Sequence, residues 1–466
     1  MDSAQIISLF GGYSLLGIVI GVVVFVVLAF KAFNLQLSAL IAAAVMLLFA
    51  GVITIGTGDG AVQYTGLGAV FQGVFTTWLG GLANALKSYF VIFCAGAIFG
   101  KLLSDGGATK SIAFAIADAI RNIKNELVRK MCAAAFVPLL YIILSYCGIS
   151  GFVMVFTVLG IGYELYKEMN IPWRLYCMGG ASCSITYAVA GSIQVPNISA
   201  ATITGSNDLL AGWQVSLICA VFFVLVFIVM LRAELKAAEK KGEGFMDTGA
   251  EFDKTGTTSG SREGLPNVIL SAIPLVLVVV LCAAFKVPAG LALIICCFVC
   301  IIFFWKNLTA KSSLKKTISE GMVGAFTPMM SVCCAVALGA VIKILPGFQY
   351  LQKLTDSLPP LFSGTALCAV LTFILASTTN AIPAMGDVIH QKYLEAGLTN
   401  AMSHRLMLVS SAPFGIMFHN GGVVNASSLA KIPYNKAVSV YIRYSCLPCL
   451  PGLIIVFTLI WSGLVK

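Results

Sequence analysis

Residues 175–207, LYCMGGASCSITYAVAGSIQVPNISAATITGSN, run for 33 residues without a charged side chain. A helix needs only about 20 apolar residues to cross the hydrocarbon core of a bilayer, so this run exceeds one span. Its middle, Gly191-Ser-Ile-Gln-Val-Pro-Asn197, is rich in small and polar residues. Lipid cannot satisfy the backbone groups that such a break frees, so it is tolerated only inside a protein or along a wet cavity.

Three other runs free of Asp, Glu, Lys and Arg follow the same plan: residues 131–163, 357–386 and 406–430. Each carries polar or small residues within it, at Ser145–Ser150, Ser377–Pro383 and His419–Gly422. One such interruption would be explained by an ordinary kink or by close helix packing. Four of them, in corresponding positions, favour discontinuous or re-entrant helices.

The composition of the whole chain agrees with a membrane protein. Of the 466 residues, 59% are hydrophobic and 10% are charged, against roughly 25% charged in a soluble domain. The net charge of +10 is explained by basic loops held on the cytoplasmic side, since no basic face interleaved with aromatic residues predicts nucleic-acid binding. Residues 101–130 contain six basic and three acidic side chains, so we expect this segment to face the cytoplasm.

The chain also contains an internal repeat. Matched features recur in the same order: a polar break at Ser145 and Ser377, an Arg-Leu pair at Arg174 and Arg405, and an Asn-bearing break at Asn197 and Asn425. Between the halves lies a charged segment with six basic and seven acidic residues. We therefore predict an all-α polytopic membrane protein with two inverted structural repeats and about 10–14 membrane segments. The predicted domains are a first repeat, a flexible hydrophilic linker and a second repeat, over residues 1–231, 232–263 and 264–466.

Three segments resemble motifs of the gluconate permease (GntP) family. The run Gly96-Ala-Ile-Phe-Gly-Lys-Leu-Leu-Ser-Asp-Gly-Gly107 is similar to the family's GAIFGKLMEDSG, and Leu144–Phe156 to LTYGGISLFVVVF. Met417-Phe-His-Asn-Gly-Gly-Val-Val424 is similar to LPHNGAVI. The likeness covers most of residues 65–445 and is greatest to the β-hydroxybutyrate permease branch. The chain departs from the pattern at Cys147, where the family has Gly, and at the more polar segment 377–380.

The resemblance implies a multi-pass carrier of small organic anions in a bacterial inner membrane, coupled to protons and built on an inverted-repeat scaffold with an elevator-like motion. The leading hypothesis is a symporter of short hydroxy-carboxylates such as 3-hydroxybutyrate. The alternatives are a gluconate, sugar-acid or other carboxylate carrier coupled to sodium, or an ion channel. No enzyme activity, cofactor or metal is expected, because ionisable residues are scarce in the apolar runs. The expected partners are the substrate anion and the lipid bilayer, with a homodimer as an open option.

The breaks supply the candidate substrate-binding residues. No Lys or Arg lies inside the four runs, so an anion would be held by the positive ends of half-helices and by hydroxyl and amide donors. The candidates are Ser145, Ser150, Gln194, Asn197, Ser377, Thr378, Thr379, Asn380, His419, Asn420 and Asn425. His419 has an unperturbed pKa of about 6.5 and is the candidate for proton coupling. The alternative is a neutral histidine bonded to a backbone carbonyl, and sodium coupling through carbonyls and hydroxyls also stays open.

Overall fold

A computed structural model describes residues 3–31, 33, 35–49, 67–146, 151–192, 194–206, 208–253, 264–283, 285, 287–311 and 314–464. Every regular element in this part of the chain is a helix. The first half contains α1 (Ser3–Phe30), α2 (Leu35–Leu48), α3 (Leu67–Asp105), α4 (Ala108–Arg121), α5 (Glu126–Tyr146), α6 (Gly151–Glu168), η1 (Trp173–Cys177), α7 (Met178–Ser182), α8 (Ser184–Ala188), α9 (Val195–Ile203) and α10 (Trp213–Lys240).

The short helix α11 (Met246–Asp253) separates the two halves. The second half contains α12 (Val268–Ala283), α13 (Ala289–Phe303), α14 (Trp305–Lys311), α15 (Leu314–Ile344), α16 (Pro346–Thr355), α17 (Pro360–Leu375), α18 (Thr378–Glu395), α19 (Asn400–Ser411), η2 (Ala412–Phe414), α20 (Gly421–Leu429) and α21 (Tyr434–Trp461). The order of long, short and broken helices is that of the first half, with α3 matching α15 and α10 matching α21.

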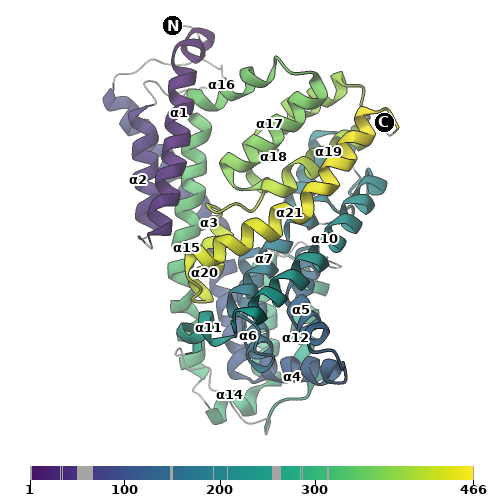
Figure 1. Cartoon of the computed structure of the whole chain (residues 1–466). Helices are drawn as coiled ribbons and strands as arrows, with labels where there is room; N and C mark the ends of the chain where they lie inside the picture. The colour runs from purple at the N-terminus through teal and green to yellow at the C-terminus, as the bar shows by residue number, and fades with distance from the viewer. Residues whose placement is uncertain are drawn as a thin grey trace.

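The halves pack against each other reciprocally. Helix α1 packs on α16, and its counterpart α12 packs on α4; α2 contacts α15, and α13 contacts α3. The matched pairs α3 with α15 and α10 with α21 contact each other directly. In Figure 1 the hairpin α1–α2 lies at the end that holds α16–α18, whereas α12 lies at the opposite end with α4–α6. Two inverted repeats produce this arrangement.

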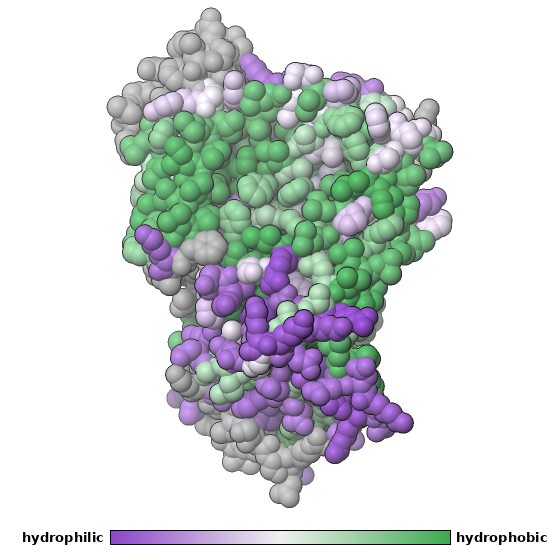
Figure 2. All heavy atoms as spheres, in the orientation of Figure 1, coloured by the Kyte–Doolittle hydropathy of each residue, from purple (hydrophilic) through white to green (hydrophobic). Residues whose placement is uncertain are grey.

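The outer surface is suited to lipid. Within the described residues, four helices are long and apolar enough to cross a membrane, and the bent helix α3 makes a fifth when it counts as one span. Four shorter apolar helices accompany them, so the chain is a multi-pass helical membrane protein. Figure 2 shows apolar residues over the upper part of the molecule and hydrophilic residues gathered below, over α11 and its neighbours. The predicted number of 10–14 segments stays a prediction.

The predicted linker differs from the structure over most of its length. Residues 232–240 continue α10, and residues 246–253 form α11, which packs against η1. This part of the predicted flexible linker is therefore helical. The run Ala233-Glu-Leu-Lys-Ala-Ala-Glu-Lys240 consists of strong helix formers, which explains why the helix runs on past the apolar segment. The Gly/Ser/Thr-rich stretch 255–261 lies outside the described residues.

Candidate functional site

Three of the predicted breaks are seen directly. The chain leaves helical geometry between α8 and α9, between α17 and α18, and between η2 and α20. At the second break Ala376 adopts a left-handed φ of 45°, and Ser377 caps α18 by accepting a hydrogen bond from the Asn380 amide at 3.3 Å. Residues 147–150 of the fourth predicted break, between α5 and α6, lie outside the described residues and include Ser150.

A cavity of about 330 Å³ lies where these breaks meet, and we call it the break cavity. Its walls come from both halves of the chain, including α3, α5 and α6 from the first and α15, α18 and α21 from the second. Seven of the predicted site residues line it: Ser145, Gln194, Ser377, Thr379, Asn380, His419 and Asn420. Asn197, Thr378 and Asn425 are buried and are not among the lining residues.

Three helix N-termini open onto the break cavity. Gln194 precedes α9, Ser377 precedes α18, and Asn420 precedes α20, and all three residues line the cavity. The first-turn N–H groups of a helix have no intrahelical partner and carry about half a positive charge. Among the described residues, no Lys or Arg lines the cavity. The site therefore offers positive potential from backbone dipoles and not from cationic side chains.

Several polar side chains in the cavity have no hydrogen-bond partner within the described chain. They belong to Thr379, Asn380 and Tyr441, and each can donate to a ligand. Ser145 and Gln194, in contrast, are engaged: the Gln194 amide donates to the Ser145 carbonyl at 2.7 Å and also to its hydroxyl. The Ser145 hydroxyl in turn pairs with that of Thr186 at 2.7 Å. Thr379 and Asn380 of α18 thus offer free donors, whereas Ser145 and Gln194 of the first half are already hydrogen-bonded to each other.

His419 lies in the wall with one ring nitrogen fixed. Its Nε2 lies 3.1 Å from the carbonyl oxygen of Ile374. Because a carbonyl only accepts, Nε2 carries the proton in the neutral ring, and Nδ1 is left as an acceptor. Nδ1 is buried and has no partner in the described chain. The bond to a carbonyl is the structural alternative considered above, and the unpaired Nδ1 leaves room for a second role.

Asn420 ties two breaks together. Its amide donates to the carbonyls of Ala376 and Gly415, and its side-chain oxygen accepts from the Gly422 amide at 2.6 Å. Both amide hydrogens are therefore used within the protein. In this state Asn420 fixes the start of α20 against the end of α17 and has no free donor for an anion.

Asn197 and Arg405 form a buried network outside the cavity. The Asn197 side-chain oxygen lies 2.8 Å from His404 Nε2 and accepts from Arg405 at 3.4 Å, while its amide donates to the Ser192 carbonyl. Arg405 is fully buried and donates to three backbone carbonyls, including that of Ala211 at 2.9 Å. Asn197 is therefore a structural residue in this state, and Arg405 joins α19 to the connection before α10.

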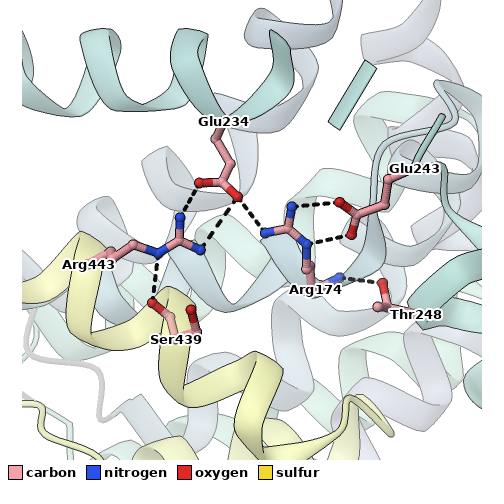
Figure 3. A network of polar contacts seen from close by, with 6 residues as sticks. All are labelled: Arg174, Glu234, Glu243, Thr248, Ser439 and Arg443. Carbon is pink, nitrogen blue, oxygen red and sulfur yellow. Dashed lines mark hydrogen bonds and ion pairs between the residues drawn. The ribbon is translucent and has the colours of Figure 1, made fainter. Parts of the chain in front are cut away.

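The matched arginine of the first half, Arg174, has a different environment (Figure 3). It donates to Glu243 at 2.5 and 2.8 Å and to Glu234 at 2.6 Å, and Arg443 also pairs with Glu234. The hydrogen bond from Arg174 holds the pKa of Glu243 below its usual range. Burial alone lowers the pKa of Arg174, but the two carboxylates outweigh it and raise the pKa overall. The network ties α10, η1 and α21 to the residues before α11.

Sequence reasoning did not single out Tyr441, His404 or Arg405 as site or network residues. The pair His404-Arg405 stands directly before the uncharged run 406–430, and that position was the available indication of a buried polar network.

No family model matches the chain. A curated relative, the uncharacterized transporter YxjC of Bacillus subtilis (strain 168), is 25% identical over 413 residues, which cover 76% of this chain and 83% of the relative. The crystal structure of the YdaH transporter of Alcanivorax borkumensis aligns over 92% of this chain and 99% of its own, with 11% identity and a TM-score of 0.38, which is too low to bear on the fold. The sequence relative supports a membrane transporter role and agrees with the expectation that the chain is not an enzyme.

Proposed function

We propose that this membrane transporter is a secondary active carrier of small organic anions, with short hydroxy-carboxylates such as 3-hydroxybutyrate as its substrates. The observation that carries the proposal is the break cavity, where three helix N-termini and free hydroxyl and amide donors meet without a cationic side chain among the described lining residues. Helix N-termini bind carboxylates through their backbone N–H groups. The hydroxyl of the substrate would pair with Thr379, Asn380 or Tyr441.

The size of the cavity supports a small substrate. Its volume of about 330 Å³ lies at the lower end of the range for small-molecule sites, which is roughly 300–1,000 Å³. Tyr441 also lines the cavity and offers a hydroxyl group, and Ile92 and Val155 offer apolar surface. The cavity therefore has a matching surface for each group of a small substrate with one carboxylate, one hydroxyl and a methyl end.

Coupling to protons is part of the proposal, with His419 as the proton-accepting group. Its unpaired Nδ1 is an acceptor in the wall of the substrate site. A proton bound there would place a positive charge beside the anion, so that each ligand favours the binding of the other. Two other ionisable side chains of the helices are engaged elsewhere: Glu164 pairs with Lys110 at 3.7 Å, and His390 Nδ1 bonds the Ser403 hydroxyl at 2.7 Å.

Membership of the gluconate permease family and a place in a bacterial inner membrane belong to the same proposal. The segment 96–107 and the segment 417–424 support it from the sequence. The first lies within α3 and the turn after it, and the second contains the start of α20 at the break cavity. A sodium-coupled carrier of gluconate or another carboxylate is the competing assignment.

The test is uptake into proteoliposomes under an imposed pH gradient or sodium gradient. The labelled probe is 3-hydroxybutyrate, competed with lactate, gluconate, citrate and D-serine. We expect accumulation above the external concentration with the acidic side outside, and its loss with a protonophore while exchange persists. Accumulation that follows sodium alone would reject proton coupling, and equilibration without accumulation would indicate a channel.

A further inference from the structure

Four helices that line one side of the break cavity contact one another in turn, and we call them the ring. Helix α3 contacts α6, α6 contacts α20, α20 contacts α15, and α15 contacts α3. Each contributes lining residues to the cavity, for example Ile92 on α3, Val155 on α6, Val336 on α15 and Gly422 on α20.

A second cavity, of about 200 Å³, lies further along the same four helices. Its lining includes Gly100 on α3, Glu164 on α6, Gly324 on α15 and Leu429 on α20, and Phe252 of α11 lies at its wall. On each helix these positions are displaced by seven to twelve residues, which corresponds to about 10–18 Å at the rise of an α-helix. We call this cavity the vestibule.

An apolar cluster borders both cavities, and we call it the septum. It is a small buried cluster, distinct from the main core, in which Phe93 and Ala97 of α3 meet Met329 and Cys333 of α15. Tyr89 and Val336, which line the break cavity, pack on the cluster, and so does Leu429, which lines the vestibule. The Met329 side chain is only 1% exposed. It can change its conformation readily, because it has three rotatable bonds.

Asn425 lies on α20 between a residue that lines the break cavity, Gly422, and one that lines the vestibule, Leu429. On α20 it follows Gly422 by three residues and precedes Leu429 by four, so the three side-chain positions share one face of the helix. Asn425 is fully buried, and neither its amide nitrogen nor its oxygen has a partner in the described chain. A buried polar group without a partner is unfavourable, because it has lost its hydrogen bonds to water, so such a group calls for an explanation. Its repeat counterpart Asn197 is hydrogen-bonded, which makes the contrast specific to this position.

We propose that the break cavity and the vestibule are successive stations of one translocation path through this ring. The septum around Met329 closes the path in this state, and the Asn425 amide donates to the substrate carboxylate as it crosses. The inference rests on the proposed transport of organic anions, since it assigns their route. Its first test nevertheless needs no substrate.

The first test measures thiol accessibility in membrane vesicles with a charged, impermeant methanethiosulfonate. The parent is the Cys132→Ser chain, since Cys132 is exposed while most other described cysteines are buried. Gly324→Cys reports on the vestibule, because a Cβ there meets no atom within 4 Å, and Thr379→Cys reports on the break cavity. The membrane side from which Gly324→Cys reacts defines the vestibule side.

From that side, we expect Thr379→Cys to react at least tenfold faster when Met329→Ala is added. Met46→Ala, which removes an equally buried methionine from α2 outside the ring, should leave the rate unchanged. Equal rates with and without Met329→Ala would overturn the path. Acceleration by Met46→Ala as well would also count against it, because a general loosening would then explain the result.

The second test addresses Asn425. Asn425→Leu, close in volume, should lower the maximal uptake rate of 3-hydroxybutyrate at least tenfold while its equilibrium Kd stays within about twofold of the parent. An unchanged rate, or a Kd that rises in proportion, would reject a role in the crossing step. If the parent does not bind 3-hydroxybutyrate at all, the proposed function fails, whereas the accessibility test still decides the path.

Discussion

Replacing Gly180 by alanine tests the geometry of the break cavity at one wall. A Cβ on Gly180 would stand 2.1 Å from the hydroxyl oxygen of Tyr441 and 2.9 Å from its ring carbon Cζ. Both residues line the cavity. Ordinary van der Waals contact begins near 3.5 Å, so the Tyr441 hydroxyl has to move by about 1 Å or more. Because Tyr441 lines the cavity, such a shift changes the shape of the cavity wall.

Overpacking of this kind costs about 1–3 kcal/mol. If the strain is felt when substrate occupies the cavity, binding weakens by roughly 5- to 150-fold. The matched rescue is Tyr441→Phe, which deletes the clashing oxygen and leaves Cζ as the nearest atom, at 2.9 Å. We expect Gly180→Ala to raise the uptake KM for 3-hydroxybutyrate about tenfold, and the double variant to return it to within about threefold of Tyr441→Phe alone.

The assay is initial-rate uptake at equal membrane abundance for the parent, both single variants and the double variant. A Gly180→Ala protein with the parent's KM would show that the ring moves away from the cavity at no cost. If the effects of the two substitutions on KM were additive, the contact between residues 180 and 441 would not be the cause of the raised KM. Either result would refute the reasoning that a clash between residues 180 and 441 weakens substrate binding.

Four further outcomes are expected. Arg405→Met should lower the free energy of unfolding in detergent by about 1–3 kcal/mol, and with it the Tm, since the Ala211 carbonyl loses its donor. An equal or higher Tm would mean that the unfavourable burial of the charge outweighs the stabilisation by its hydrogen bonds. The pKa of Glu243 is depressed in the folded state. Its contribution to stability is therefore present above its pKa in the unfolded chain, about 4.3, and is lost as the pH falls through its pKa in the folded state. Glu243→Gln should accordingly flatten the fall of Tm with pH below about pH 4.5. A reporter at Asn122 should be labelled from the cytoplasmic side only, and periplasmic labelling would reverse the orientation. Asn420→Ala should raise the uptake KM, because the link between two breaks is lost. His419→Gln should shift the pH profile of uptake more than the KM. If both variants kept the KM and the pH profile of the parent, this break would not be needed for transport.

The sequence predicted the breaks well because their causes are local. Gly, Pro, Ser and Asn in an apolar run interrupt a helix through their own backbone and side-chain chemistry, as Ser377 does by capping α18. The cavity could be anticipated for the same reason, since breaks of two repeats at matching depth have to face a common interior. Seven of the eleven candidate residues line it.

The roles of individual side chains could not be predicted in this way. Asn197 and Asn420 looked like ligand donors, yet their partners are His404, 207 positions away, and the Ala376 carbonyl, 44 positions away. Such pairings depend on how distant helices meet, and no local pattern records that. The helical part of the predicted linker is a different case, because its Ala, Glu, Leu and Lys content already favoured a helix.

The reciprocal packing of α1 on α16 and of α12 on α4 means that each half completes its fold with an element of the other half. A lone half would leave those apolar faces uncovered, and only a second copy in the opposite orientation would cover them. Joining the halves in one chain fixes their ratio at one to one. It also means that the two halves need not find each other by diffusion in the membrane. A short connection keeps each half near the other at a high effective concentration, on the order of millimolar.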